Sequence, residues 1–72
     1  MRLTELKEGE EAVVEKLIDK NNTFLRRIEA MGLKKGEKIK LEKIIGRNYV
    51  VLLEGRKLAI DRELASLVEV KK

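Results

Sequence analysis

The stretch Arg26 to Leu41, RRIEAMGLKKGEKIKL, changes its hydrophobic period within a few residues and so decides the fold class. Just before this stretch and in its first half, apolar residues recur at helical spacing, at Phe24, Leu25, Ile28 and Met31. After the two glycines, Ile39 and Leu41 instead alternate with charged residues, as on a strand with one buried face. The stretch therefore predicts a short helix, a tight turn and then a strand.

Local signals predict where this helix begins and ends. Thr23 is expected to be its N-cap, because a threonine hydroxyl can accept a hydrogen bond from a first-turn amide. The helix should run to about Met31 and end at Gly32, since a glycine after a helix commonly takes the left-handed conformation. Leu33 should then pack back on Ile28. Gly36 is expected to be a second structural turn glycine before the next strand.

The rest of the chain predicts short strands that are separated by turns. An apolar turn at Leu3 and Leu6 should come first, and a polar loop is expected at residues 19–22. Asp61 should cap a helical turn that extends through Ala65. Strands are expected at about residues 11–18, 37–45, 49–53, 57–60 and 68–70, with turns at Gly46, Arg47 and Asn48 and at Gly55 and Arg56. We expect one mainly β domain over residues 1–72, a bent sheet of about five strands closing into a small barrel.

Composition limits the chemistry that such a domain can perform. The 72 residues include neither cysteine nor histidine. These two residue types are the commonest soft-metal ligands, and histidine is also the commonest general base. We therefore expect no catalytic residues, no cofactor and no metal site. The longest apolar run, from Tyr49 to Leu53, is far shorter than the roughly 20 residues that cross a bilayer. A cytoplasmic protein is expected.

The charge pattern gives a weak signal for nucleic acid. A net charge of +4 comes from 17 basic and 13 acidic residues, and the acidic ones are interleaved with the lysines. Phe24 and Tyr49 are the only aromatic residues, and Phe24 is expected to lie in the core, which leaves little for base stacking. Nucleic acid is therefore not the expected partner.

The helix and the glycine turn after it form the most distinctive surface. Arg26, Arg27 and Glu29 are expected to lie outside, with Met31 and Leu33 at the edge. Apolar edge residues surrounded by arginines suit a protein-binding site with a central anchor and a polar rim. The alternative is an ordinary solvated helix face.

Three segments resemble the FeoA family of ferrous iron transport accessory proteins over essentially the whole chain: LTELKEGEEAVVEKL, RRIEAMGLKKGEKIKL and GRKLAIDRELASLVEV. The central hairpin departs from the family pattern, because Gly46, Arg47, Asn48 and Tyr49 stand where the family usually has a glycine-aspartate-proline-apolar turn. The matching positions are Leu6, Gly9, Arg26, Arg27, Ile28, Met31, Gly32, Leu33, Gly36, Ile60, Ala65 and Val70.

The resemblance implies an SH3-like barrel that serves as a cytosolic adaptor. Its expected partner is the cytosolic part of FeoB, a membrane Fe(II) transporter with a G-protein domain, and the chain would reach the membrane only through that partner. Two alternatives stay open. One is a detached regulatory domain related to DtxR-type metal-dependent repressors, against which the absence of a helix-turn-helix pattern counts. The other is a small barrel that binds nucleic acid through its lysines.

Overall fold

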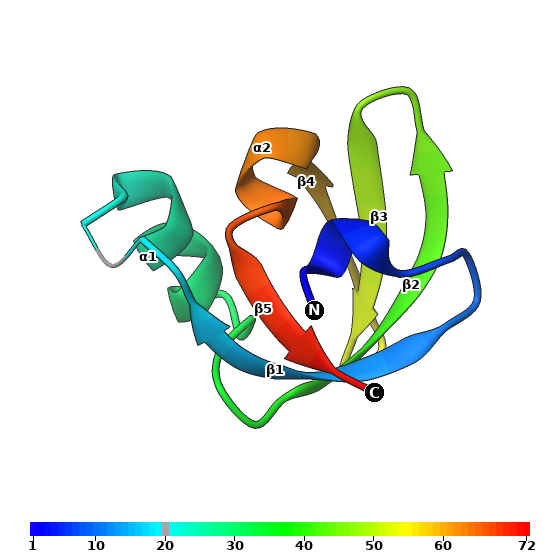
Figure 1. The fold of residues 1–72 in the computed structure, drawn as a ribbon, viewed down its shortest axis with the longest axis horizontal. Helices are drawn as coiled ribbons and strands as arrows, with labels where there is room; N and C mark the ends of the chain where they lie inside the picture. Colours follow the sequence, from blue (N-terminus) through cyan, green and yellow to red (C-terminus); the bar gives the residue numbers. More distant parts are fainter. Residues whose placement is uncertain (20) are drawn as a thin grey trace.

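A computed structural model describes residues 1–19 and 21–72, which fold into a bent sheet flanked by short helices (Figure 1). The described residues are mainly β, as expected. Lys20, in the middle of the loop expected at residues 19–22, lies outside the described residues. In chain order the elements are η1 (Leu3–Glu5), β1 (Glu11–Leu17), α1 (Thr23–Ala30), β2 (Lys38–Ile45), β3 (Asn48–Leu53), β4 (Arg56–Asp61), α2 (Arg62–Ala65) and β5 (Val68–Lys71).

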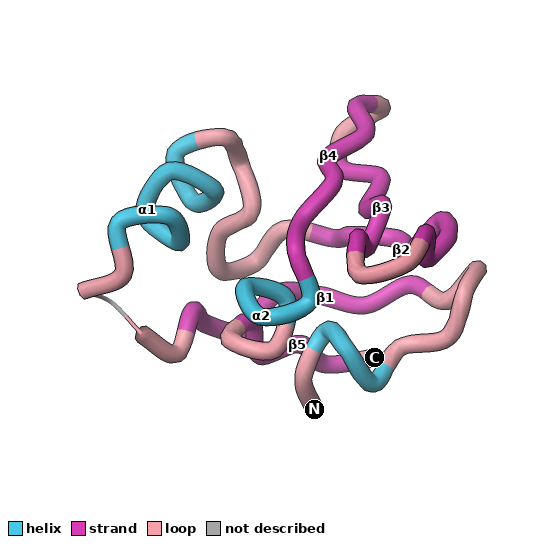
Figure 2. Tube along the Cα trace, turned by 90° about the horizontal axis from the view of Figure 1, so that it is seen from above, coloured by secondary structure: helices cyan, strands magenta, loops and turns pink. Residues whose placement is uncertain are grey.

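The five-stranded sheet is antiparallel throughout, with strand order β4-β3-β2-β1-β5. β1 is shared between its two neighbours: its first residues, 11–13, pair with β2, and residues 13–17 pair with β5. The register with β5 shifts between Val14 and Lys16, and such a bulge bends a strand and increases its twist. The β1–β5 pair consequently turns away from β2, β3 and β4, and the sheet curves around the core (Figure 2).

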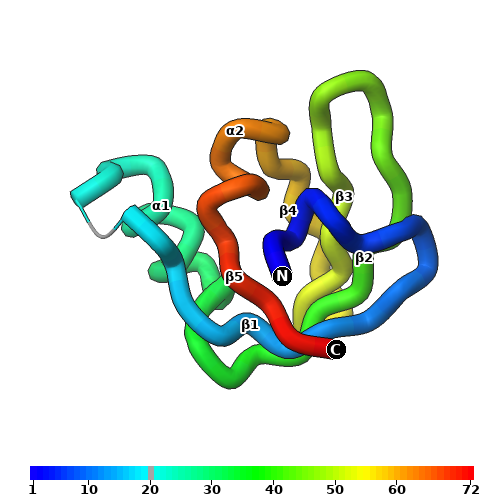
Figure 3. Tube along the Cα trace, in the orientation of Figure 1, coloured from blue at the N-terminus to red at the C-terminus, as the bar shows by residue number. Residues whose placement is uncertain are grey.

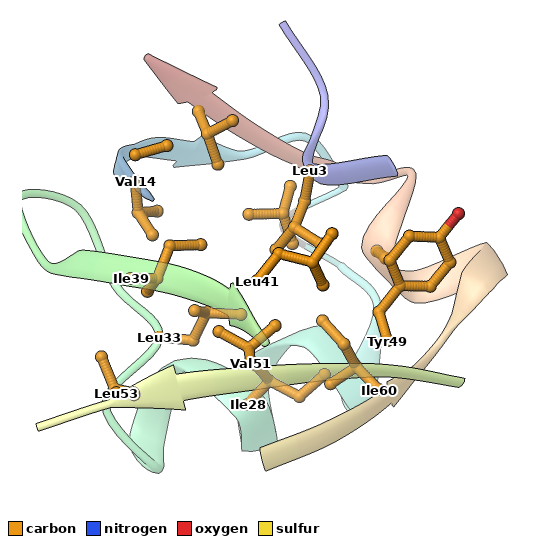
Figure 4. Close-up of a cluster of buried hydrophobic side chains, with 14 of the residues drawn as sticks. Leu3, Val14, Ile28, Leu33, Ile39, Leu41, Tyr49, Val51, Leu53 and Ile60 are labelled. Atoms are coloured by element: carbon orange, nitrogen blue, oxygen red, sulfur yellow. The ribbon is translucent and has the colours of Figure 1, made fainter. Parts of the chain in front are cut away.

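The core is aliphatic apart from one tyrosine. Alternate residues of β2 and β3 point inward, namely Ile39 and Leu41 from one strand and Val51 and Leu53 from the other. Figure 4 shows these side chains converging with those of the helix and the N-terminal turn. The buried set is Leu3, Leu6, Ala12, Val14, Leu17, Leu25, Ile28, Leu33, Ile39, Leu41, Tyr49, Val51, Leu53, Ile60, Ala65, Val68 and Val70.

Three expected local details are wrong, each by one residue. Asn48, expected in the turn with Gly46 and Arg47, is the first residue of β3 and pairs with Ile45. The N-cap of α1 is Asn22 rather than Thr23: its carboxamide oxygen accepts hydrogen bonds from the Phe24 and Leu25 amides at 2.9 and 3.2 Å. Asparagine ranks above threonine as an N-cap, so cap preference already favoured Asn22 over Thr23. The β3–β4 turn is Glu54-Gly55, because Arg56 already pairs with Leu53. Asp61 caps α2 as expected, accepting from the Glu63 amide at 2.8 Å.

The N-terminal residues cover part of the outer edge of β5. The Met1 ammonium donates to the Glu69 carboxylate at 2.7 Å, and the Val70 amide donates to the Met1 carbonyl at 2.7 Å. Arg2 forms a bridge with Glu69. Backbone pairing of this kind protects an edge strand from pairing with other chains.

This contact predicts a pH dependence of stability. The hydrogen bond from the Met1 ammonium lowers the pKa of Glu69 below the ordinary 4.5, and the same bond raises the pKa of the ammonium above 8.0. The stabilisation should therefore be complete between pH 4.5 and 8.0, and should be lost as the pH falls through the pKa of Glu69 or rises through that of the ammonium. Thermal unfolding of Glu69→Gln should show a flatter pH profile than wild type at both ends. Identical profiles would mean that the pair does not contribute.

Candidate protein-interaction site

Helix α1 is held by a cap at each end. Asn22 caps the beginning, and the end is a full Schellman motif: the Leu33 amide donates to the Ile28 carbonyl at 3.1 Å and the Gly32 amide to the Glu29 carbonyl at 3.0 Å. Gly32 has φ +115°, in the region that favours glycine, as the sequence predicted. Gly36, at φ +92°, is the second turn glycine before β2. These two turns orient α1 relative to the sheet.

Gly32 is also closely packed. A Cβ atom on this residue would lie 3.2 Å from Leu53 Cδ2 and 3.1 Å from Arg56 Nη2. The same Arg56 nitrogen donates to the Met31 carbonyl at 2.8 Å, which ties the end of the helix to β4. At Gly36, by contrast, a Cβ would have no neighbouring atom within 4 Å.

The predicted surface is divided between the two flanks of α1. Arg27 lies on one flank with Phe24 and Met31, at the spacing i, i+3 and i+7 that places residues along one side of a helix. The Arg27 guanidinium carbon lies 5.9 Å from the centre of the Phe24 ring, a cation–π distance. We call Phe24, Arg27 and Met31 the aromatic flank.

Arg26 and Glu29 lie on the opposite flank. They line a cleft of about 540 Å³ between α1 and residues 15–17 of β1, with Lys35 at its end. Leu17 and Leu25 form its apolar floor, while most other lining residues are charged. Arg26 and Arg27 are both exposed, as expected, but neighbouring positions on a helix point about 100° apart, so the two side chains lie on different flanks of α1.

Two residues exchange the roles that the sequence predicted for them. Leu33 is 0% exposed and belongs to the core, so it cannot form the edge of a contact surface (Figure 4). Phe24, expected in the core, is 61% exposed, and Met31 is 48% exposed. The helix buries only Leu25 and Ile28, because Leu33 folds back beneath it and fills the space that another helix residue would occupy. The position of Phe24 in the first turn, one residue before Leu25, is the sequence signal that could have indicated its exposure.

The carboxylates near the N-terminus serve structural roles. Glu8 accepts a hydrogen bond from the Ile44 amide at 2.7 Å, Glu10 accepts one from the Lys7 amide at 2.6 Å and pairs with Lys72, and Glu11 pairs with Lys38 at 3.5 Å. Within residues 1–19 and 21–72, no group of three or more histidine, cysteine, aspartate or glutamate residues is arranged to hold a metal ion. In the same part of the chain, no helix is long and apolar enough to cross a membrane.

Comparison with solved structures identifies the same architecture in ferrous iron transport proteins. FeoA from Chlorobium tepidum is 29% identical with a TM-score of 0.90, over 99% of this chain and 69% of that chain. The zinc complex of FeoA from Stenotrophomonas maltophilia, a procaryotic SH3 domain protein, is 28% identical with a TM-score of 0.87, over 99% of this chain and 89% of that chain. The fold is therefore the expected SH3-like barrel.

A protein with a different name, IdeR, contains the same barrel. IdeR from T. acidophilum is 25% identical with a TM-score of 0.88, over 99% of this chain and 33% of that chain. No curated protein matches the sequence. The model of the FeoA domain family matches residues 1–72. The chain therefore belongs to the FeoA family, whose members are accessory proteins of ferrous iron transport.

Proposed function

We propose that this protein is a cytoplasmic accessory protein of ferrous iron uptake that binds the cytosolic part of a FeoB-like membrane transporter and modulates it. It acts by binding and performs no chemistry of its own. The aromatic flank of α1 is the anchor of this contact, and Arg26 and Glu29 on the other flank form part of its rim. Leu33 and Gly32 support the site from beneath.

The observation that carries this proposal is the exposure of Phe24 and Met31 beside Arg27 in a protein with few aromatic residues. Aromatic residues, methionine and arginine are enriched in protein interfaces, where a few of them supply most of the binding energy. The Arg27 guanidinium, 5.9 Å from the centre of the Phe24 ring, places a positive charge directly beside this anchor. The cleft flank has a mixed-charge lining and offers no comparable exposed anchor.

A second candidate rests on the likeness to IdeR. Because this chain matches 33% of IdeR, it could serve as a regulatory barrel that contacts the remaining domains of such a repressor. This candidate predicts binding to the DNA-binding part of an IdeR-type protein. Titrating both partners against labelled protein separates the two, since the transporter proposal predicts binding to the FeoB-like G-protein part alone.

The transporter proposal is tested by two matched charge reversals. Arg27→Glu and Arg26→Glu change the net charge equally and lie one residue apart, but on opposite flanks. Arg27→Glu should weaken binding to the cytosolic part of a FeoB-like transporter by about tenfold, or ~1.4 kcal/mol, because it places a carboxylate against Phe24 at the anchor. Arg26→Glu should weaken binding by less than about threefold, as rim charges usually do. Calorimetric or fluorescence titration measures both constants.

Phe24→Ser serves as the second variant, because an exposed side chain can be removed without loss of the fold. It should also weaken binding by at least about tenfold. The wild-type affinity should fall with salt, and Arg27→Glu should lose most of that dependence. If all three variants bind as tightly as wild type while folded, α1 is an ordinary solvated face and the contact lies elsewhere.

A further inference from the structure

The β2–β3 hairpin projects from the body beside α2 (Figures 1 and 3). Its tip is the segment Ile44 to Arg47, which connects the two strands through Gly46. Ile45 is 55% exposed and Ile44 is 37% exposed. Single exposed aliphatic residues are common on protein surfaces, but two consecutive ones at a projecting turn form a local apolar protrusion.

The two isoleucines lie on opposite faces of the hairpin. Ile44 stands opposite Tyr49, whose side chain is on the core face, whereas Ile45 stands opposite Asn48 on the outer face. A protein that docks on one face of the strand pair would cover one isoleucine and leave the other in water. A medium that surrounds the tip removes both from water at once, and the apolar region of a lipid bilayer is such a medium.

Basic residues flank this apolar tip on both sides. Lys43 precedes the isoleucines and Arg47 follows Gly46, and both side chains are exposed. The Arg62 amide donates to the Arg47 carbonyl at 2.8 Å, so exposed Arg62 at the start of α2 lies close to the base of the tip. Lysine and arginine at the edge of an inserted apolar group can pair with anionic headgroups.

Two acidic groups near the tip accept hydrogen bonds from backbone amides, and Glu42, which precedes Lys43, pairs with Lys57 at 3.3 Å. Glu8 accepts from the Ile44 amide at 2.7 Å, and Asp61, opposite Asn48, accepts from the Glu63 amide at 2.8 Å. The first contact places the Glu8 carboxylate at the backbone of Ile44 in the tip, beside the flanking Lys43, and the second holds Asp61 at the N-terminus of α2. The tip together with the preceding Lys43, residues 43–47, contributes two positive charges and no negative charge of its own.

We propose that the β2–β3 tip inserts into the interface of an anionic lipid bilayer, with Ile44 and Ile45 among the acyl chains and Lys43 and Arg47 at the headgroups. The protein then binds a membrane surface directly. This goes beyond the proposed function, because the contact needs no transporter and uses a surface separate from α1. An experiment with lipid alone therefore fails or succeeds independently of transporter binding.

Ile45→Trp provides a direct probe, because the chain contains no other tryptophan. On addition of vesicles that contain phosphatidylglycerol, its emission should shift to the blue, and lipids brominated on the acyl chains should quench it. Phe24→Trp is the matched control: it is at least as exposed in the free protein but lies on α1, and it should show neither effect. Equal shifts in both variants, or none in Ile45→Trp, would overturn the proposal.

Sedimentation with the same vesicles tests the unlabelled protein. Wild type should partition onto phosphatidylglycerol vesicles more strongly than onto phosphatidylcholine vesicles. I44S/I45S should lower the partition coefficient at least about tenfold, from the apolar area lost. Ile44 lies opposite Tyr49 on the core face, whereas Ile45 lies on the outer face. Ile45→Ser alone therefore disturbs the fold less, and it should lower the partition coefficient by about threefold.

F24S/M31S removes an equally exposed apolar pair from α1 and should leave vesicle binding unchanged. Lys43→Gln with Arg47→Gln should remove most of the preference for the anionic vesicles. Wild-type protein that remains in the supernatant overturns the proposal. If I44S/I45S instead loses only transporter binding, the tip is a protein contact and the membrane inference is wrong.

Discussion

Leu33→Ala is expected to lower the free energy of unfolding by about 2–5 kcal/mol, which is a large part of the stability of so small a domain. Leu33 is fully buried between the end of α1 and the strands, and its amide completes the Schellman motif through Ile28. Removing its side chain leaves a cavity where the helix rests on the core. Urea unfolding followed by far-UV circular dichroism measures the loss.

Met31→Ala is the matched control, because Met31 lies two residues away and is largely exposed. It should change stability by less than about 0.5 kcal/mol. The two variants thus distinguish a residue that supports the site from one that forms its surface. Leu33→Ala should reduce transporter binding only by unfolding the protein. Met31→Ala should reduce transporter binding while the protein stays folded. Equal stability losses in the two variants would show that the helix is packed differently.

Gly32→Val is expected to destabilise the protein by about 2–6 kcal/mol through two additive effects. A β-branched residue at φ +115° is strained by about 1–3 kcal/mol. The new side chain would also meet Leu53 Cδ2 and Arg56 Nη2 at little more than 3 Å from its Cβ, and overpacking costs a further ~1–3 kcal/mol. The hydrogen bond from Arg56 to Met31 should be lost as well. Thermal unfolding measures the sum.

Gly36→Val isolates the backbone strain, so the difference between the two variants gives the packing effect. Its φ of +92° imposes backbone strain of the same kind, but a Cβ at this position meets no atom within 4 Å. It should therefore destabilise the protein by only about 1–3 kcal/mol. If the two variants unfold together, close approach to Leu53 does not matter, and strain alone accounts for the requirement for glycine at position 32.

Most of the fold could be predicted from local sequence signals. The change from helical to alternating spacing at Gly36 predicted α1 and β2, and the glycine turns predicted β3 and β4 to within about one residue of their ends. Asp61 indicated the cap of α2, and Gly32 indicated the left-handed turn after α1. These features were predictable because each depends on a residue and its near neighbours.

The membership of the candidate site was not predictable in the same way. Periodicity tells which residues share a helix face, but it does not tell what covers that face. In α1, the fold-back of Leu33 and the neighbouring strands cover only Leu25 and Ile28, so Phe24 remains in water and Leu33 does not. That Arg26 lines the α1–β1 cleft and Arg27 does not likewise depends on where β1 lies.

The sequence by itself thus determined the strands, the two capped helices, the turn glycines and the supply of chemical groups, which lacks histidine and cysteine. Only the tertiary structure decided which apolar side chains remain exposed, at Phe24 and Met31 on the helix and at Ile44 and Ile45 on the hairpin. The physical reason is that burial depends on contacts between segments far apart in the chain. Those contacts are set by the bend of β1 and the docking of α1 on the sheet, and a local pattern does not encode them.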